Sequence, residues 1–287
     1  MYLADGWSDF EILNAGDGEK LERWGNVVLL RPDPQAIWPM EQPKHYDARY
    51  NRSSSGGGEW SFNSSLPESW TIGYGDLRFI VRPTGFKHTG LFPEQAVNWD
   101  FMRGFVERFQ RRHARPFRAL NLFAYTGGAT LALAAGGAET VHVDAAKGMV
   151  AWAKSNLAES GLADRPVRFI VDDAMKFVQR EKRRGRQYDG ILMDPPSYGR
   201  GPTGEMWRIE DGLYPLVNEC CELLSDDAGF FLINSYTTGL APTVVRNVLK
   251  VALGGRGGAI EAEEIGLPIS NGLVLPCGCT GRWSRET

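Results

Sequence analysis

Short apolar segments alternate with longer amphipathic ones along residues 116–287 of this 287-residue chain. The apolar segments predict strands, and the amphipathic ones predict helices. The predicted strands are 119–123, 140–143, 167–171, 190–193 and 229–234, with candidate strands at 259–265 and 273–275. The predicted helices are 129–135, 147–160, 174–182, 209–224 and 243–253. This alternation predicts an α/β fold with a doubly wound sheet, whose ligand lies beyond the carboxyl ends of the strands.

The region before this alternation has a different character. Residues 1–95 are rich in Trp, Gly, Ser and Pro, with short alternating runs at 24–30 and 77–81 and a glycine-rich loop at 53–58. This pattern predicts a small, mostly β N-terminal region on the substrate side. The catalytic domain is predicted to comprise residues 96–287. It begins with a helix over 100–112 that has Phe101, Phe105 and Phe109 on one face.

Composition limits the class of protein. Hydrophobic residues make up 43% of the chain and charged residues 23%, as in ordinary globular proteins. No run of 18 apolar residues and no secretory signal is present, so we expect no membrane association. Four cysteines form no disulfide framework, which favours a reducing cytoplasm. The four histidines are scattered, and Cys277-Gly278-Cys279 is a weak candidate, so no metal site is predicted.

A glycine turn follows the first predicted strand of the sheet. Residues 121–128 read Asn-Leu-Phe-Ala-Tyr-Thr-Gly-Gly, and a helix is predicted immediately afterwards. Glycines let the backbone approach a ligand, and the helix N-terminus favours an anion. Both NAD and S-adenosylmethionine bind at turns of this kind, although the G-x-G-x-x-G fingerprint of dinucleotide sites is absent. The alternative is a tight strand–helix turn with no ligand.

Acidic residues end the next two predicted strands. Asp144 is positioned to accept the two hydroxyls of a ribose, and the occurrence of the glycine turn favours that role. Asp172-Asp173-Ala174 is positioned to bind the amino group of an adenine, with Asp173 the better candidate of the two acids. For Asp144 and for Asp173 the alternative is a helix N-cap.

The sharpest motif is Asp194-Pro195-Pro196-Ser197, which ends the fourth predicted strand. Two prolines fix the backbone and remove its N–H donors, leaving rigid carbonyls that only accept hydrogen bonds. Beside an aspartate, this segment forms an acceptor for the N–H of a base, with Tyr198 available to stack on its ring. Such a site catalyses by positioning and electrostatics. The alternative is a Pro-Pro that only terminates a strand.

Two basic segments stand out on a chain of net charge −3. Residues 101–118 contain six arginines against one acid, and residues 180–186 contain five basic residues against one acid. Clusters of this kind form phosphate-facing surfaces, or else they are solvated helix faces.

Residues 84–284 resemble the class I methyltransferases related to the 23S rRNA base methyltransferases, namely the cytosine-C5 enzymes and the guanine-N7 half of the bifunctional enzyme. The resemblance rests on Lys87-His88-Thr89-Gly90-Leu91-Phe92, residues 121–127, Asp144, Asp172-Asp173, Asp194-Pro195-Pro196 and Leu275-Pro276. It implies a Rossmann-like methyltransferase sheet. The cofactor-binding residues that it and the motifs imply are Thr89, Gly90, Phe92, Phe123, Tyr125, Thr126, Gly127, Gly128, Asp144, Ala145, Asp172, Asp173 and Ala174, and the catalytic residues are Asp194, Pro195, Pro196, Ser197 and Tyr198.

Two departures from the family pattern matter. The family continues its Thr-Gly-x-Phe segment with an acid, Gln or His, and Arg, whereas this chain reads Glu94-Gln95-Ala96, so the arginine is missing or supplied elsewhere. The cytosine enzymes carry a nucleophilic cysteine after the fifth strand, where this chain reads Asn234-Ser235-Tyr236-Thr237-Thr238. Transfer to a nitrogen or oxygen therefore fits better than cytosine-C5 chemistry.

The sequence thus predicts a cytoplasmic methyltransferase that uses S-adenosylmethionine to methylate a base of RNA, with ribosomal RNA favoured. One alternative changes the acceptor to a protein or a small molecule. A second is an NAD-binding oxidoreductase, which would leave Asp194-Pro195-Pro196 without a purpose. A third is an RNA-binding relative without catalytic activity.

Overall fold

The computed structural model describes residues 1–53, 57–85, 87–200, 206–237 and 239–285, and these divide into two units. Unit 1 comprises Met1, Asn98–Glu264 and Gly278–Thr287. Unit 2 comprises Tyr2–Val97 and Ile265–Cys277, so it includes a second, later piece of chain. Half of the predicted glycine loop of residues 53–58, namely residues 54–56, lies outside the described residues.

The main sheet has the strand order β1-β16-β17-β15-β12-β9-β10-β11. Its strands are β1 (Tyr2–Leu3), β9 (Arg118–Leu122), β10 (Glu139–Asp144), β11 (Val167–Val171), β12 (Gly190–Met193), β15 (Phe230–Ser235), β16 (Ala259–Pro268) and β17 (Val274–Ser284). The strands from β15 to β11 are parallel, and β17 pairs antiparallel with β15. The predicted α/β class is confirmed. The short β1 pairs with Ile265 and Gly266, at the end of β16 that belongs to unit 2.

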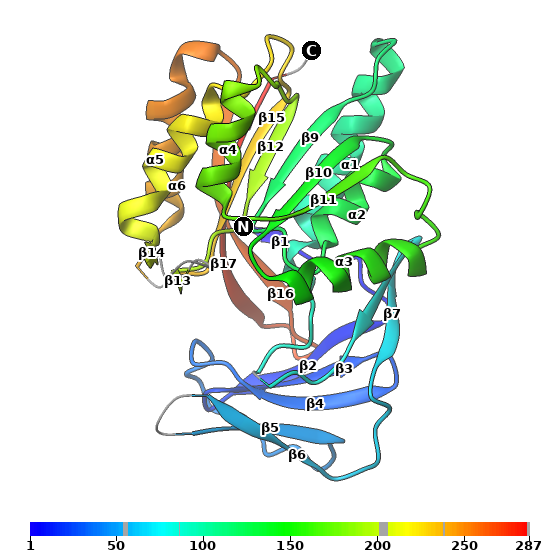
Figure 1. Ribbon diagram of the computed structural model, residues 1–287. Coiled ribbons are helices and arrows are strands. Elements are labelled where there is room, and N and C mark those ends of the chain that lie inside the picture. The colour runs from blue at the N-terminus through cyan, green and yellow to red at the C-terminus, as the bar shows by residue number, and fades with distance from the viewer. Residues whose placement is uncertain (54–56, 86, 201–205, 238, 286–287) are drawn as a thin grey trace. The chain divides into compact units, whose positions relative to one another are not determined.

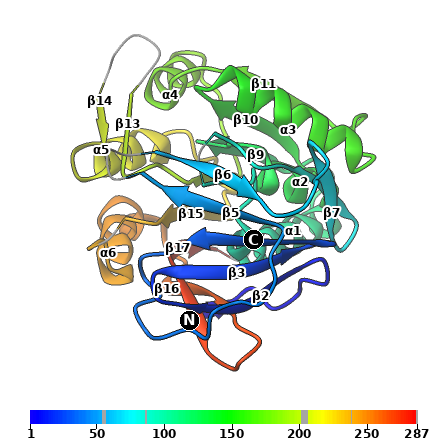
Figure 2. The same ribbon diagram turned by 90° about the horizontal axis from the view of Figure 1, so that it is seen from below.

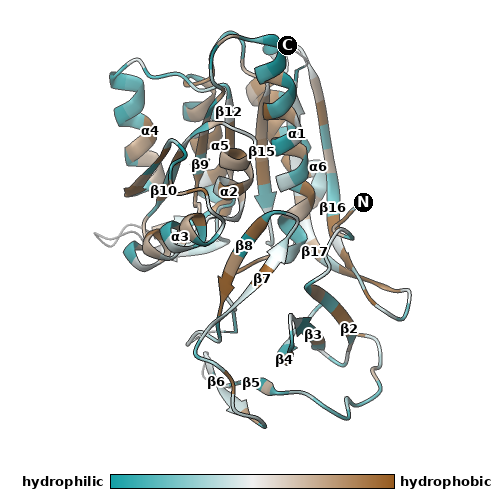
Figure 3. Ribbon diagram, turned by 90° about the vertical axis from the view of Figure 1, so that its right-hand side faces the viewer, coloured by the Kyte–Doolittle hydropathy of each residue, from teal (hydrophilic) through white to brown (hydrophobic). Residues whose placement is uncertain are grey.

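Helices cover both faces of this sheet (Figure 1). One face carries α1 (Ala96–Arg112), α2 (Gly128–Ala135) and α3 (Lys147–Glu159), and the other carries α4 (Ala174–Arg183), α5 (Ile209–Cys221) and α6 (Pro242–Leu253). Short 3-10 turns lie at Pro93–Gln95 and Gly254–Arg256. Because both faces are covered, every residue of β12 and β15 is buried. Figure 3 shows these central strands as mainly hydrophobic and the outer sides of the helices as hydrophilic.

Successive side chains of β15 pack on opposite faces, as the pleat of a strand requires. Phe230 contacts Phe105 of α1, with ring centroids 5.5 Å apart, and Phe231 joins the cluster under α4, α5 and α6. The predicted stripe of α1 therefore packs on the sheet. Cys220 and Cys221 are buried in α5.

Unit 2 contains a five-stranded sheet in the order β2-β3-β4-β5-β6 and a separate hairpin, β7-β8 (Figure 2). The strands are β2 (Phe10–Gly16), β3 (Glu19–Trp24), β4 (Val27–Pro32), β5 (Ala48–Arg52), β6 (Gly58–Phe62), β7 (Trp70–Tyr74) and β8 (Leu77–Val81). The β-rich character predicted for the N-terminal region is confirmed. Neighbouring strands are antiparallel except β4 and β5, which are parallel.

Two parts of unit 1 differ from the predicted elements. A hairpin of β13 (Tyr198–Arg200) and β14 (Met206–Arg208) follows the Asp-Pro-Pro motif and was not predicted. The last strand, predicted at 273–275, extends to Ser284, although Pro276 and Gly278 interrupt its apolar pattern. Among the described helices, none combines the length and apolar composition needed to cross a membrane. The described residues also contain no group of three or more His, Cys, Asp or Glu side chains placed to hold a metal ion.

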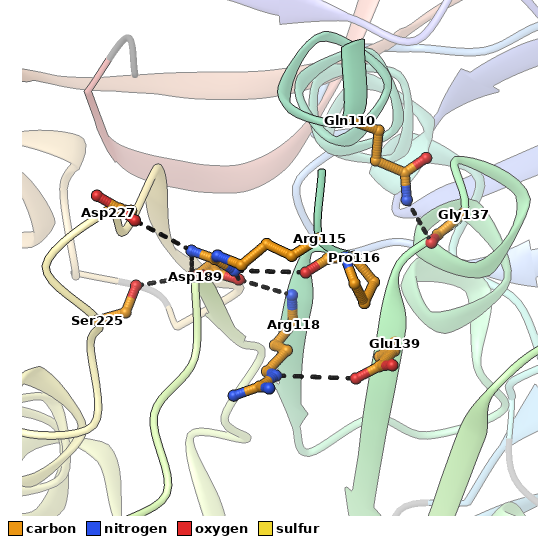
Figure 4. Close-up of polar contacts among 9 residues, drawn as sticks. All are labelled: Gln110, Arg115, Pro116, Arg118, Gly137, Glu139, Asp189, Ser225 and Asp227. Carbon is orange, nitrogen blue, oxygen red and sulfur yellow. Dashed lines mark hydrogen bonds and ion pairs between the residues drawn. The ribbon is translucent and has the colours of Figure 1, made fainter. Parts of the chain in front are cut away.

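Arg115 and Asp189 fasten the amino ends of β9 and β12 (Figure 4). The buried Asp189 carboxylate accepts hydrogen bonds from the two Arg115 Nη atoms, at 2.6 and 2.9 Å. It also accepts from the Arg118 backbone N at 2.9 Å and from Ser225 Oγ at 2.7 Å. Arg115 lies in the first basic segment, and its side chain, 39% exposed, is bound through the guanidinium to Asp189 at the amino end of β12.

We predict that Arg115→Met lowers the free energy of unfolding by about 2 kcal/mol, because two charge-assisted hydrogen bonds to a buried carboxylate disappear. Urea denaturation measures the change. Arg111→Met, an exposed position on α1, is the control and is expected to shift stability by no more than about 0.5 kcal/mol. Equal, small effects at the two positions would contradict a structural role for Arg115.

Candidate active site

The predicted site segments of unit 1 lie at strand ends on one edge of the sheet. This carboxyl edge carries the β9–α2 turn, Asp144 at the end of β10, Asp172 and Asp173 after β11, and Asp194 after β12. The strand order reverses between β9 and β12, because β10 and β11 continue on one side and β15 on the other. Doubly wound sheets bind their ligands at such a reversal.

The turn after β9 has an unusual backbone. Phe123, Tyr125 and Gly127 have φ values of +54°, +49° and +89°, and the first two are not glycines. Such conformations cost on the order of 1–3 kcal/mol for a non-glycine residue and persist where neighbours fix them. Here the Ala124 N donates to Val143 O at 3.0 Å, and the Tyr125 N donates to Asp144 Oδ2 at 2.8 Å.

Space disfavours a side chain at both glycines of this turn, and the positive φ of Gly127 disfavours one there by conformation as well. A Cβ on Gly127 would lie 3.0 Å from the Cβ of Ala153 on α3, and one on Gly128 would lie 2.6 Å from Trp99. Gly127 is the N-cap of α2 and forms no side-chain capping bond. The first N–H groups of α2 are therefore available to an anion.

Hydrogen bonds from buried side chains hold the β9–α2 turn in place. Asn156 on α3 donates to Thr126 O at 2.9 Å. Asn121 donates to Thr130 Oγ1 at 2.9 Å, and Thr130 Oγ1 lies 2.9 Å from His142 Nδ1, so three elements are joined. Sequence reasoning named Thr126 but missed the supporting roles of Asn156, Thr130 and His142, because these depend on partners elsewhere in the chain. Burial lowers the pKa of His142 to about 3, so the ring is neutral at neutral pH.

Asp144 connects the end of β10 to this turn. Its Oδ2 accepts from Tyr125 N and its Oδ1 accepts from Ala146 N, each at 2.8 Å. Burial raises the pKa of Asp144, and the two backbone donors oppose that rise. Each carboxylate oxygen has two lone pairs, so both retain capacity for a ligand hydroxyl. The N-cap of α3 is Ala146 and not Asp144, so the two backbone contacts of Asp144 leave the ribose-binding role open. Ala145 beside it is exposed.

The two acids after β11 are both engaged. Asp173 is the N-cap of α4 and accepts from Lys176 N at 2.9 Å, which is the alternative role that the sequence left open. Asp172 forms an ion pair with Arg180 and accepts from the Asp173 N. The Asp172 N donates to Asp144 O at 3.1 Å, which holds this segment beside the end of β10. Ala174 is buried at the start of α4.

The Asp-Pro-Pro segment is fixed at several points. Asp194 N lies 3.4 Å from Leu122 O, at the end of β9. Pro195 is buried, and the Pro196 carbonyl accepts from Trp207 Nε1 at 2.7 Å. Ser197 Oγ lies 2.6 Å from Thr237 Oγ1, beyond the end of β15.

An aromatic group borders this segment. The Trp207 ring lies 5.2 Å from that of Phe123, and Gly212 makes room for it, since a Cβ there would approach Trp207 to 2.6 Å. Tyr198 is 53% exposed and its hydroxyl donates to Met206 Sδ. Trp207 was missed by sequence reasoning. The run Tyr-Gly-Arg-Gly-Pro-Thr-Gly-Glu-Met-Trp-Arg has turn residues between two three-residue segments, a signal that could have indicated a hairpin but was not used.

Thr89, Gly90 and Phe92 lie in unit 2, so their relation to the strand ends of unit 1 remains a prediction. Thr89 is fully buried, and its hydroxyl has no hydrogen-bond partner within the described ranges. A buried arginine does reach this segment, since Arg31 Nη1 donates to Lys87 O at 2.7 Å. Arg31 also pairs with Glu22 at 2.5 Å.

Comparisons with known proteins agree with this geometry. Residues 27–225 match the model of the S-adenosylmethionine-dependent methyltransferase family. The crystal structure of a SAM-dependent methyltransferase from Agrobacterium tumefaciens is 37% identical, with a TM-score of 0.93 over 99% of this chain and 93% of that one.

Two sequence relatives are named ribosomal RNA large subunit methyltransferase K/L. The one from Methylococcus capsulatus is 30% identical over 242 residues, which is 80% of this chain and 31% of that protein. The one from Shewanella baltica is 35% identical over 157 residues, which is 54% of this chain and 20% of that protein. The matched part is therefore less than a third of the length of these two relatives.

The fold is a doubly wound α/β sheet, the class of protein whose ligands lie at the reversal of strand order. The chain belongs to the S-adenosylmethionine-dependent methyltransferase family. It is a methyltransferase that uses S-adenosylmethionine, and the alternative of an NAD-binding oxidoreductase is wrong.

We predict that His142 contributes to the loss of stability in acid. Its pKa falls from 6.5 to about 3 on folding, so the unfolded state takes up a proton that the folded state excludes. This stability is fully present above about pH 6.5 and is lost as the pH falls toward 3, by up to about 1.4 kcal/mol per pH unit.

Urea denaturation at several pH values measures this contribution. His142→Asn is expected to show a shallower fall in unfolding free energy between pH 6.5 and 4 than the wild type. His45→Asn, at a histidine whose side chain is 76% exposed, is the control and is expected to keep the wild-type slope. If the unfolding free energy of all three proteins fell equally with pH, the His142 ring would not be held neutral by burial.

Proposed function

We propose that this chain methylates a nitrogen of a ribosomal RNA base, without a covalent cysteine intermediate. The observation that carries the proposal is the position of Asp194-Pro195-Pro196 at the reversal of strand order, beside the end of β9 and the Trp207 ring. An acceptor-only segment beside an aromatic surface suits a flat, N–H-bearing ring. The two relatives named as ribosomal RNA methyltransferases support RNA as the substrate. Such a substrate would place the enzyme in the cytoplasm.

One group of residues would bind the methyl donor, and another group would bind the methyl acceptor. Gly127 and Gly128, with Phe123, Tyr125 and Thr126, would hold the methionine end of the donor at the N-terminus of α2. Asp144 and Ala145 would bind the ribose, and Asp172, Asp173 and Ala174 would border the adenine. Thr89, Gly90 and Phe92 would be further donor-binding residues, as the family resemblance implies. When bound, S-adenosylmethionine supplies an electrophilic methyl group on a sulfonium.

The acceptor side would act by orientation. The Asp194 carboxylate and the proline carbonyls would accept the N–H hydrogen bonds of the base, which directs the lone pair of its nitrogen toward the methyl group. Ser197 would stay fixed through Thr237, and Tyr198 with Trp207 would stack on the ring. Unit 2, with its own sheet, would serve the acceptor side.

The cysteines support the absence of a covalent intermediate. All four are buried. Burial raises the pKa of Cys221 and the pKa of Cys279 to about 11. Burial also raises the pKa values of Cys220 and Cys277 well above that of a free thiol. A nucleophilic cysteine must be a thiolate, so these thiols are inert at neutral pH.

The test is transfer of a labelled methyl group to large-subunit ribosomal RNA transcribed in vitro. We predict that Asp194→Ala lowers kcat by at least about a hundredfold and leaves donor affinity nearly unchanged, because its partner is the acceptor. Asp226→Ala, an exposed aspartate on the turn before β15, is the control and should retain the wild-type rate.

Two results would contradict the proposal. A variant that loses donor affinity but keeps its rate at saturating donor would move Asp194 to the donor side. A wild-type enzyme that binds S-adenosylmethionine but transfers no methyl group to the RNA would reject RNA as the acceptor, in favour of a protein or a small molecule.

A further inference from the structure

A pocket of about 490 Å³ lies in unit 1 at the edge of the sheet opposite the candidate active site. Its lining includes the first residues of three neighbouring strands, namely Arg118 of β9, Glu139 of β10 and Val167 of β11. The glycine turn, Asp144 and Asp172-Asp173 lie at the other ends of these three strands, and Asp194 follows the same end of the neighbouring β12. The pocket is therefore separate from the site described above.

The lining of the pocket carries an excess of positive charge. It contains Arg118, Arg165, Arg168 and Arg186 against Glu139 and Glu181. Figure 4 shows Arg118 facing Glu139, with 3.8 Å between Nε and Oε2 and both side chains about half exposed, so this pair is weak.

The second acid is already occupied. The buried Glu181 accepts a hydrogen bond from Tyr188 at 2.7 Å and one from Arg184 at 3.0 Å. By contrast, Arg165, Arg168 and Arg186 have no hydrogen-bond or ion-pair partner for their guanidinium groups in the described part of the chain. Three guanidinium groups thus remain for a ligand.

The pocket also contains an unsatisfied hydroxyl. Thr140 lines it and is 1% exposed, and its Oγ1 has no hydrogen-bond partner among the described residues. Leaving a buried hydroxyl unpaired is unfavourable, so a ligand that reached it would bind better. The same pocket is also lined by the largely apolar side chains of Val141, Pro166 and Tyr188.

We propose that this pocket binds a nucleotide through its phosphate group. Guanidinium groups bind the oxygens of phosphates and carboxylates in pairs, and three of them in one pocket suit the greater charge and the larger number of oxygens of a phosphate. The volume is in the range of small-molecule sites and exceeds what a phosphate alone requires, and the apolar wall suits a base. The nucleotide is either free or one unit of a bound RNA, and only the latter source depends on the proposed function.

Calorimetric titration of the full chain tests the site with three probes: inorganic phosphate, the four 5′-mononucleotides and a 12-residue oligoribonucleotide. Arg165→Gln combined with Arg168→Gln is expected to weaken nucleotide or oligonucleotide binding at least about tenfold. Arg246→Gln combined with Lys250→Gln removes the same charge from the exposed side of α6 and should change affinity less than about twofold.

Thr140→Val separates binding from folding. It removes the hydroxyl and keeps the shape of the side chain, so we expect an unchanged or higher melting temperature together with affinity reduced several-fold. A variant that gains stability and binds every probe like the wild type would assign the hydroxyl no role in binding and would count against the site.

The probes also distinguish the two sources. Mononucleotide binding that falls in the arginine variant establishes a free-nucleotide site, whether or not ribosomal RNA is methylated. Binding of the oligonucleotide alone, lost in the same variant, assigns the pocket to RNA. No nucleotide or oligonucleotide binding, or equal losses in the test and control variants, would overturn the inference, and methylation of RNA would then still stand.

Discussion

The carboxylate of Asp144 is the contact on which the site depends, because it holds two strand ends in one arrangement. It accepts a hydrogen bond from the turn after β9 and another from the backbone just before α3. The turn it fixes contains two non-glycine residues in the left-handed region, which would relax without such support. The position of Gly127 and the open N-terminus of α2 follow from that turn.

The two edges of the same sheet have different chemistry. At the carboxyl edge the strands end in acids, prolines and a strained turn, which together suit a cationic donor and a flat acceptor. At the amino edge Asp189 accepts from the Arg118 backbone N and binds Arg115, so the start of β9 is locked. The side chain of the same Arg118 lines the pocket proposed to bind a nucleotide. One residue therefore takes part both in the contact with Asp189, through its backbone N, and in the pocket.

The sequence predicted the main sheet well, because fully buried parallel strands appear as apolar runs that end in glycine or acidic residues. It also placed the segments of the candidate site at the correct strand ends, since the carboxyl ends of parallel strands share one edge. It left the roles of Asp144 and Asp173 open, and the structure shows that Asp173 caps α4.

The missed features depend on contacts between residues far apart in the chain. Arg115 pairs with Asp189 across 74 positions, Asn156 supports Thr126 across 30, and the Trp207 ring contacts Phe123. Periodicity and turn signals describe neighbours along the chain, so they contain no information on these pairs. The hairpin of β13 and β14 was missed for a different reason, because each of its strands has only three residues.

The central claim is that the donor binds where the strand order reverses, at the carboxyl edge of β9, β10 and β11. Amide chemical-shift mapping by NMR, with S-adenosylhomocysteine added to the full chain, tests it most directly. We expect the largest shifts at the amides of Tyr125, Gly127 and Ala146, followed by Asp173, and none at Arg165 or Arg168. Shifts confined to the amino edge of the sheet, or none at Tyr125 and Gly127 under saturating ligand, would contradict the account.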